Sequence, residues 1–102
     1  MRPIHLVQLD KARPAVILTR PAVRERLRSV TVAPITSRIR GLSIEVRVGP
    51  RNGLDAESVI NCDNLATIDA RLVGRGLGVL HPDQEDALAR AIATAFDLEV
   101  DW

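Results

Sequence analysis

The sequence predicts a mainly β protein: a small, strongly curved sheet or barrel with one helix packed on it at the C-terminal end. Short apolar stretches rich in β-branched residues follow one another through the first three-quarters of the chain. Residues 42–48 alternate apolar and polar side chains, as a half-buried strand does. After Pro82 the apolar residues recur at helical spacing instead.

The first half of the chain contains three predicted strands. Residues 4–9 form an apolar stretch, and residues 14–19 contain four apolar residues without a polar break, which indicates a strand buried on both faces. Residues 21–27 begin with a proline and mix charges, which suits one helical turn or a loop. Residues 30–36 are rich in β-branched residues and form the third strand.

The second half continues with the alternating strand at 42–48, and a turn follows around residues 50–53. Further short strands are expected at 58–62, 65–68 and 72–80. In the last of these strands three glycines occupy alternate positions, which leaves a smooth strip where another backbone can approach: Gly74, Gly76 and Gly78.

The C-terminal helix is predicted to start at Pro82, with acidic residues in the first turn, where negative charge is favoured. Its apolar stripe should face the sheet and consists of Leu88, Ala91, Ile92, Ala95 and Phe96.

Length and composition set outer limits. The chain has 102 residues, 46% of them apolar, and no apolar run of membrane-spanning length, so one domain over residues 1–102 is expected, with no membrane partner. Cys62 is the only cysteine, which excludes an intramolecular disulfide and a cysteine zinc site. The N-terminus lacks a secretory signal, so a cytoplasmic location is expected. Two aromatic residues, Phe96 and Trp102, are too few for a module that holds single strands by stacking.

The formal net charge of +1 hides an uneven distribution. Residues 1–53 hold 11 basic and 3 acidic side chains, whereas residues 54–102 hold 3 basic and 10 acidic ones. If the two halves form separate faces, the basic one suits a polyanionic partner such as a nucleic acid.

Most enzyme classes lack their motifs here. The sequence has no GxxxxGK[ST] phosphate loop, GxSxG elbow or HExxH pair. His5 and His81 lie at opposite ends of the chain with no clustered partner, so neither a metal site nor a cofactor is expected. Cys62 is interpreted as a small buried apolar residue on a strand.

Basic and hydroxyl side chains gather at two strand ends. Guanidinium and hydroxyl groups together bind phosphate without a metal, because the guanidinium neutralises charge on oxygen while the hydroxyl donates a hydrogen bond. Spacing alone also allows a solvated basic rim. The residues concerned are Lys11 and Arg13 before the second strand, and Thr36, Ser37, Arg38 and Arg40 at the end of the third.

At these residues the sequence resembles the MazF/PemK family, the toxin half of bacterial toxin–antitoxin pairs. RPAVIL (residues 13–18) resembles the family's arginine-containing strand, and VAPITS (residues 32–37) resembles its threonine-containing strand. CDNLATIDARL (residues 62–72) resembles a third family stretch, and the terminal helix falls where the family has one. The match looks closest to a mycobacterial subgroup.

The resemblance implies an SH3-like barrel of the MazF/CcdB/PemK type, a homodimer, and a cognate MazE-like antitoxin. It also implies a sequence-selective, metal-independent endoribonuclease that cleaves single-stranded RNA by attack of the 2′-hydroxyl, leaving a 2′,3′-cyclic phosphate and a 5′-hydroxyl. Arg13 and Thr36 would be the catalytic residues. The substrate-binding candidates are Lys11, Ser37, Arg38, Arg40 and Asn64, with the turn at Arg51 and Asn52 as further candidates for contacts to the RNA backbone.

Two other functions compete with this one. CcdB-like toxins resemble the family in fold but act by binding DNA gyrase, and they use a Trp-Gly-Ile ending that is missing here, where Trp102 is the last residue. The other is a plain SH3-like interaction module. Arg13 and Thr36 in matching strand contexts favour the ribonuclease over both.

Overall fold

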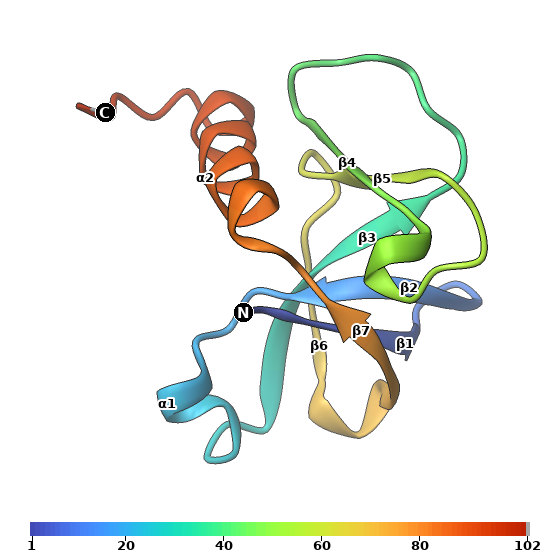
Figure 1. Cartoon of the computed structure of the whole chain (residues 1–102). Coiled ribbons are helices and arrows are strands. Elements are labelled where there is room, and N and C mark those ends of the chain that lie inside the picture. Colours follow the sequence, from blue (N-terminus) through green and yellow to red (C-terminus); the bar gives the residue numbers. More distant parts are fainter. Residues whose placement is uncertain (102) are drawn as a thin grey trace.

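The computed structural model describes residues 1–101; Trp102, one of the two aromatic residues, lies outside the described part. A curved sheet of seven strands carries a C-terminal helix, as the sequence predicts (Figure 1). The elements are β1 (Pro3–Gln8), β2 (Ala12–Ile17), α1 (Pro21–Arg24), β3 (Ser29–Thr36), β4 (Glu45–Val48), the 3-10 helix η1 (Pro50–Asn52), β5 (Ser58–Asn61), β6 (Ala66–Asp69), the 3-10 helix η2 (Ala70–Leu72), β7 (Val73–Val79) and α2 (Pro82–Ala95).

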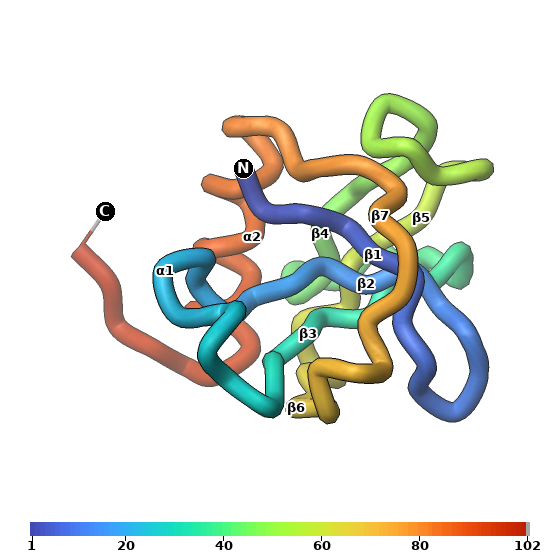
Figure 2. The backbone as a smooth tube through the Cα atoms, turned by 90° about the horizontal axis from the view of Figure 1, so that it is seen from below, coloured from blue at the N-terminus to red at the C-terminus, as the bar shows by residue number. Residues whose placement is uncertain are grey.

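β3 is the strand around which the sheet bends. The sheet order is β4-β5-β3-β2-β1-β7, and all pairs are antiparallel. The first half of β3 pairs with β6, while its last two residues, Ile35 and Thr36, pair with β5. Figure 2 shows β7 beside β1, and the strand order makes β7 the end strand opposite β4. Because one edge of β3 pairs first with β6 and then with β5, the sheet curves around this strand into a half-barrel.

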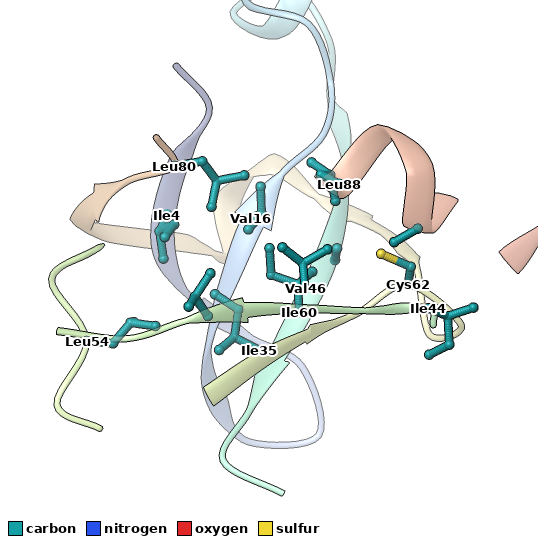
Figure 3. Packing of buried hydrophobic residues seen from close by; sticks show 13 residues of the cluster. Ile4, Val16, Ile35, Ile44, Val46, Leu54, Ile60, Cys62, Leu80 and Leu88 are labelled. Carbon is teal, nitrogen blue, oxygen red and sulfur yellow. The ribbon is translucent and has the colours of Figure 1, made fainter. Parts of the chain in front are cut away.

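The sheet has apolar side chains on both faces. In β2, Ala15, Val16 and Ile17 are all completely buried. Val16 belongs to the larger cluster, which includes Leu88 of α2 (Figure 3), while Ala15 and Ile17 belong to a second cluster. Because successive side chains of a strand point to opposite faces, β2 is buried on both sides, which confirms the prediction from its unbroken apolar run.

The predicted close backbone approach to the glycines of β7 is confirmed at Gly74 and Gly78, but not at Gly76, whose Cβ would meet only the His5 ring at 3.7 and 3.9 Å. A Cβ atom on Gly78 would lie 2.0 Å from the carbonyl oxygen of Asn52, and one on Gly74 would lie 2.9 Å from that of Leu6. Gly53 has a φ of 83°, and its own Cβ would lie 1.9 Å from the carbonyl oxygen of Leu77. The turn after η1 thus rests directly on β7, where only glycine fits.

Asn52 is buried at the centre of that contact. It is 1% exposed, and its amide nitrogen donates to the carbonyl of Val79 and to Gln84 Oε1, at 3.0 and 2.7 Å. Its Oδ1 accepts hydrogen bonds from the Gly49 N–H and from Gln84 Nε2. The proposal of Asn52 as a contact to the RNA backbone is therefore wrong, because every polar group of its side chain already bonds within the protein.

α2 begins at Pro82 as predicted, and Leu88 and Ala91 are buried against the sheet. Phe96 departs from the predicted stripe: it is 55% exposed. The helix ends before it, because Asp97 adopts a left-handed conformation with φ 52° and the Leu98 N–H bonds to the Ala93 carbonyl at 2.8 Å. This is the hydrogen bond of a Schellman motif, which turns the chain away from the helix axis.

The strand predicted at 42–48 is shorter than expected. β4 starts at Glu45, and Leu42 before it is 46% exposed. Apolar and polar residues alternate through residues 42–44, but these residues belong to the loop that connects β3 to β4. Gly41, in the same loop, has a φ of 75°, which is not a strand conformation. In the part of the chain described here, no helix has the length and apolar character of a membrane span.

The basic and acidic halves of the sequence do not form separate faces throughout. Arg2 pairs with Glu85 at 3.0 Å and Arg51 pairs with Asp83 at 2.7 Å, so the acidic first turn of α2 is partly neutralised by the basic half. The Arg51 partner lowers the pKa of the Asp83 carboxyl.

Candidate functional site

Arg13 and Thr36 lie on neighbouring strands at the same end of the sheet. β2 pairs with β3 in a register that joins Ala15 to Pro34 and Val16 to Ala33. Continuing this register by two residues sets Arg13 opposite Thr36, and both side chains then belong to the face on which Ala15 and Pro34 lie. Two residues far apart in the sequence are therefore brought together by strand pairing alone.

Two hollows meet at this pair, and Arg13, Ile35 and Thr36 line both of them. We call the first the Asn64 hollow; it has a volume of about 380 Å³. The second, the Asp55 hollow, has about 310 Å³. Arg13 and Thr36 therefore stand on the ridge between two hollows.

The two hollows collect all seven residues that the sequence singles out as catalytic or substrate-binding. Arg38, Arg40 and Asn64 line the Asn64 hollow together with the central pair. Lys11 and Ser37 line the Asp55 hollow. Arg51, the further candidate, is not brought to this place: it lines a different hollow and is paired with Asp83.

The guanidinium of Arg13 is held by Asp10. Nε and Nη2 of Arg13 donate to the two oxygens of the Asp10 carboxylate, at 2.9 and 3.0 Å. This pairing lowers the pKa of Asp10 to about 2 and raises the pKa of Arg13. Arg13 is therefore a permanent cation, which suits it to stabilise negative charge and not to accept a proton.

Thr36 is the last residue of β3, and its hydroxyl makes a local hydrogen bond. Its Oγ1 accepts from the backbone N–H of Arg38 at 3.1 Å. The oxygen is thereby held in one position, and the hydroxyl proton is free to be donated to an oxygen of a ligand.

The loop that carries Arg38 and Arg40 is fixed by a carboxylate. Glu45, the first residue of β4, accepts hydrogen bonds from the Arg40 N–H, at 3.2 and 3.3 Å to its two oxygens, and from the Leu42 N–H at 3.0 Å. Glu45 itself lines the Asn64 hollow. The Glu45 carboxylate therefore orders the β3–β4 loop by accepting hydrogen bonds from two of its backbone amides.

Sequence reasoning missed four side chains of the site. Asp10 stands three residues before Arg13, and this spacing was the one available signal for an ion pair. Asn61, Glu45 and Asp55 reach the hollows only through the pairing of β4 with β5 and the turn after η1, so no local pattern marks them. All four line one of the two hollows.

Cys62 and the histidines lie away from the Arg13–Thr36 pair. Cys62 is completely buried, and burial raises the pKa of its thiol to about 11, which agrees with the interpretation as a small apolar residue. His5 Nδ1 lies 2.9 Å from the Gly74 carbonyl oxygen, and His81 precedes α2. Residues 1–101 contain no group of three or more histidine, cysteine, aspartate or glutamate side chains arranged to hold a metal ion.

Comparison with known proteins agrees with this architecture. Residues 5–96 match the family described as "PemK-like, MazF-like toxin of type II toxin-antitoxin system". "Endoribonuclease MazF3" of Mycobacterium tuberculosis strain H37Rv is 58% identical over 102 residues, which are all of this chain and 97% of the relative.

Solved structures agree as well. The Mycobacterium tuberculosis toxin MazF-mt6 superposes with a TM-score of 0.94 at 57% identity, covering 99% of this chain and 100% of that one. An endoribonuclease from a mycobacterial species, solved in complex with its cognate antitoxin, gives a TM-score of 0.85 at 25% identity and covers 97% of this chain and 95% of that one. The resemblance noted in the sequence is thereby confirmed, and the chain belongs to the PemK-like, MazF-like toxins of type II toxin–antitoxin systems.

Proposed function

We propose that residues 1–102 act as one toxin domain, a sequence-selective and metal-independent endoribonuclease that cleaves single-stranded RNA. The observation that carries the proposal is the ridge formed by Arg13 and Thr36 between two hollows. A phosphate on this ridge has room for a nucleoside on either side, as cleavage inside a chain requires. The relatives named as endoribonucleases support the same activity.

In the proposed reaction the ribose 2′-hydroxyl releases its proton to water as its oxygen attacks the adjacent phosphorus, and the bond from phosphorus to the 5′-oxygen breaks. The products are a 2′,3′-cyclic phosphate and a 5′-hydroxyl, whose oxygen takes up a proton as it leaves. Arg13 stabilises the charge that builds on the non-bridging oxygens, and the Thr36 hydroxyl donates a hydrogen bond to one of them. DNA is not cleaved, because it lacks the attacking hydroxyl.

Basic side chains around the ridge suit the RNA backbone. Lys11 and Ser37 border one hollow, and Arg38 and Arg40 border the other, so phosphates on both sides of the cut meet a positive or hydrogen-bonding group. Asn64 offers an amide that can both donate to and accept from a base.

Metal independence rests on the nature of the candidate groups. Arg13 supplies the positive charge that a metal ion supplies in other nucleases, and Asp10, the carboxylate beside it, is occupied by the guanidinium. The proposed step therefore proceeds with this chain's own residues.

The proposal includes a homodimer, a cognate MazE-like antitoxin and a cytoplasmic location. An antitoxin is proposed because a relative of the same fold has been solved in complex with one. Gyrase binding of the CcdB type is not favoured, since the relatives at 58% and 38% identity are named endoribonucleases.

The test is incubation of the protein with end-labelled single-stranded RNA in excess EDTA. Cleavage at defined positions, with cyclic phosphate and 5′-hydroxyl ends, is the expected result. Cleavage that requires an added divalent ion would overturn metal independence, and an intact RNA would overturn the ribonuclease itself. Single 2′-deoxy substitution at the cut should abolish cleavage there and nowhere else.

A further inference from the structure

Asp55 differs from the other carboxylates at the site in having no partner. Asp10 is occupied by Arg13, and Glu45 binds two backbone amides of the β3–β4 loop. Asp55 is exposed, lines the Asp55 hollow, and makes no hydrogen bond or ion pair within the described residues. An acceptor is thus left free beside the proposed cleavage site.

The Asp55 hollow is charged unevenly. Lys11 and Arg13 contribute cations, whereas Asp55 contributes the one carboxylate among its lining residues. The hydroxyl of Ser58, also in the lining, donates to the Ala56 carbonyl at 3.0 Å, so its proton is used. The hollow therefore offers positive charge for a phosphate and a free hydrogen-bond acceptor for some other part of the ligand.

A carboxylate in a groove for a polyanion repels any phosphate that comes close. Its presence is compatible with RNA binding only where it faces a part of the nucleotide that donates hydrogen bonds. Base edges do so: cytosine, adenine and guanine carry exocyclic amino groups, and carboxylates accept from the amino group of cytosine in known readout, whereas uracil presents a carbonyl at the corresponding position.

The remaining walls suit a base. Pro14, Ile35 and Leu54 are apolar residues of the lining, and the volume of about 310 Å³ lies in the range of small-molecule sites. Apolar walls with one directed acceptor bind a flat, mostly apolar ring and select it by its edge.

We propose that the Asp55 hollow holds one of the two nucleosides that flank the cut, and that Asp55 selects a base with an exocyclic amino group over uracil. This inference rests on the proposed ribonuclease function. It assigns Asp55 as a specificity-determining residue, with Lys11 and Arg13 on the phosphate side of the same nucleotide.

The first test maps cut sites in a pool of single-stranded RNA with random sequence, by sequencing the fragments with 5′-hydroxyl ends. Wild type is compared with Asp55→Asn and Asp55→Ala. The control is Glu57→Gln, which makes the same change of charge two residues away and lines a different hollow.

Wild type should prefer amino-bearing bases at one position next to the cut. Both Asp55 variants should weaken this preference about tenfold, the discrimination expected from one good hydrogen-bonded contact to a base, while other positions stay unchanged. Glu57→Gln should keep the wild-type pattern. An unchanged pattern in both Asp55 variants, or no preference for amino bases at either flanking position in wild type, would overturn the inference.

A second test separates this inference from the cleavage activity. Fluorescently labelled oligonucleotides with 2′-deoxyribose at the cut bind without being cleaved, and they differ only in cytosine or uracil at the flanking position. Wild type should bind the cytosine oligonucleotide more tightly, and Asp55→Ala should bind both equally. A chain that fails to cleave RNA but shows this difference would refute the ribonuclease and leave the base preference standing; equal binding by wild type would refute the base preference.

Discussion

The Asp10 carboxylate accepts two hydrogen bonds from the Arg13 guanidinium, from Nε at 2.9 Å and from Nη2 at 3.0 Å. This leaves Nη1 without a hydrogen bond to residues 1–101, so it is available to a phosphate oxygen. A two-point contact fixes the plane of the guanidinium as well as its position. Asp10 therefore fixes the orientation of the Arg13 guanidinium and leaves its Nη1 group able to donate a hydrogen bond to a ligand.

Replacing Asp10 tests this aiming role. Asp10→Asn keeps the shape but weakens the charge-assisted contact, and the cleavage rate should fall by about tenfold, as expected for the loss of one such interaction. Because the pKa of Asp10 is held at about 2, the carboxylate stays ionised down to that region, and the ratio of variant to wild-type rate should be constant between pH 5 and 8. Asp69→Asn is the control, since Asp69 also holds an arginine, Arg71, away from the site. An equal loss in both variants would argue against a specific role for Asp10.

Thr36→Val replaces the hydroxyl with a methyl group of similar size. The rate of cleavage should fall by about 100-fold, in line with removal of one donor to a transition-state oxygen. Single-turnover rates at saturating enzyme measure this directly. Thr67→Val serves as the control, because Thr67 is exposed on β6 and bonds only to Thr31. A Thr36 variant that cleaves as fast as wild type would remove Thr36 from the mechanism.

Glu45→Gln tests whether the β3–β4 loop must be ordered for RNA binding. The neutral amide is a weaker acceptor for the N–H groups of Arg40 and Leu42, so the KM for RNA should rise about fivefold while kcat changes little. Glu25→Gln, a matched loss of one exposed negative charge near α1, should leave KM at or slightly below the wild-type value. A fall in kcat with unchanged KM would instead connect Glu45 to the chemical step.

Asn52→Ala should act on stability alone. It leaves the buried groups of Gln84 and Val79 without their partner, and the free energy of unfolding should drop by about 3 kcal/mol. Thermal unfolding at fixed protein concentration measures the effect, with Gln8→Ala at an exposed position of β1 as the control. Cleavage per folded molecule should be unchanged. Loss of cleavage by the folded variant would contradict the assignment of Asn52 to stability alone.

Patterns in short stretches of the sequence predicted the burial of β2 and the start of α2, but not the end of α2. Pro82 with the acidic first turn predicted the start of α2, because helix initiation depends on neighbouring residues. The apolar run of β2 predicted burial on both faces, because such a run is stable only where other segments cover both sides of the strand. The end of α2 was wrong at Phe96. The helical spacing of apolar residues includes Phe96, but α2 ends at Ala95, and the left-handed conformation of Asp97 turns the chain away from the helix.

The candidate site was predictable only in part, for a related reason. Arg13 and Thr36 were found through their chemistry and through resemblance to the toxin family. Asp55 and Glu45 reach the hollows by strand pairing and a turn that rests on glycine, and Asn52 was misjudged because its burial depends on β7 and α2. Contacts between distant segments leave no periodic signal in the sequence.

The central claim is that Arg13 supplies the charge that stabilises the transition state. Arg13→Ala should reduce the single-turnover rate of RNA cleavage in EDTA by about 100-fold or more, by analogy with the loss of a transition-state donor. Arg71→Ala is the matched control, because Arg71 is an exposed arginine paired with an aspartate but outside both hollows. Near wild-type cleavage by Arg71→Ala together with a loss of 100-fold in Arg13→Ala is the predicted result, and cleavage by Arg13→Ala at the wild-type rate would contradict it.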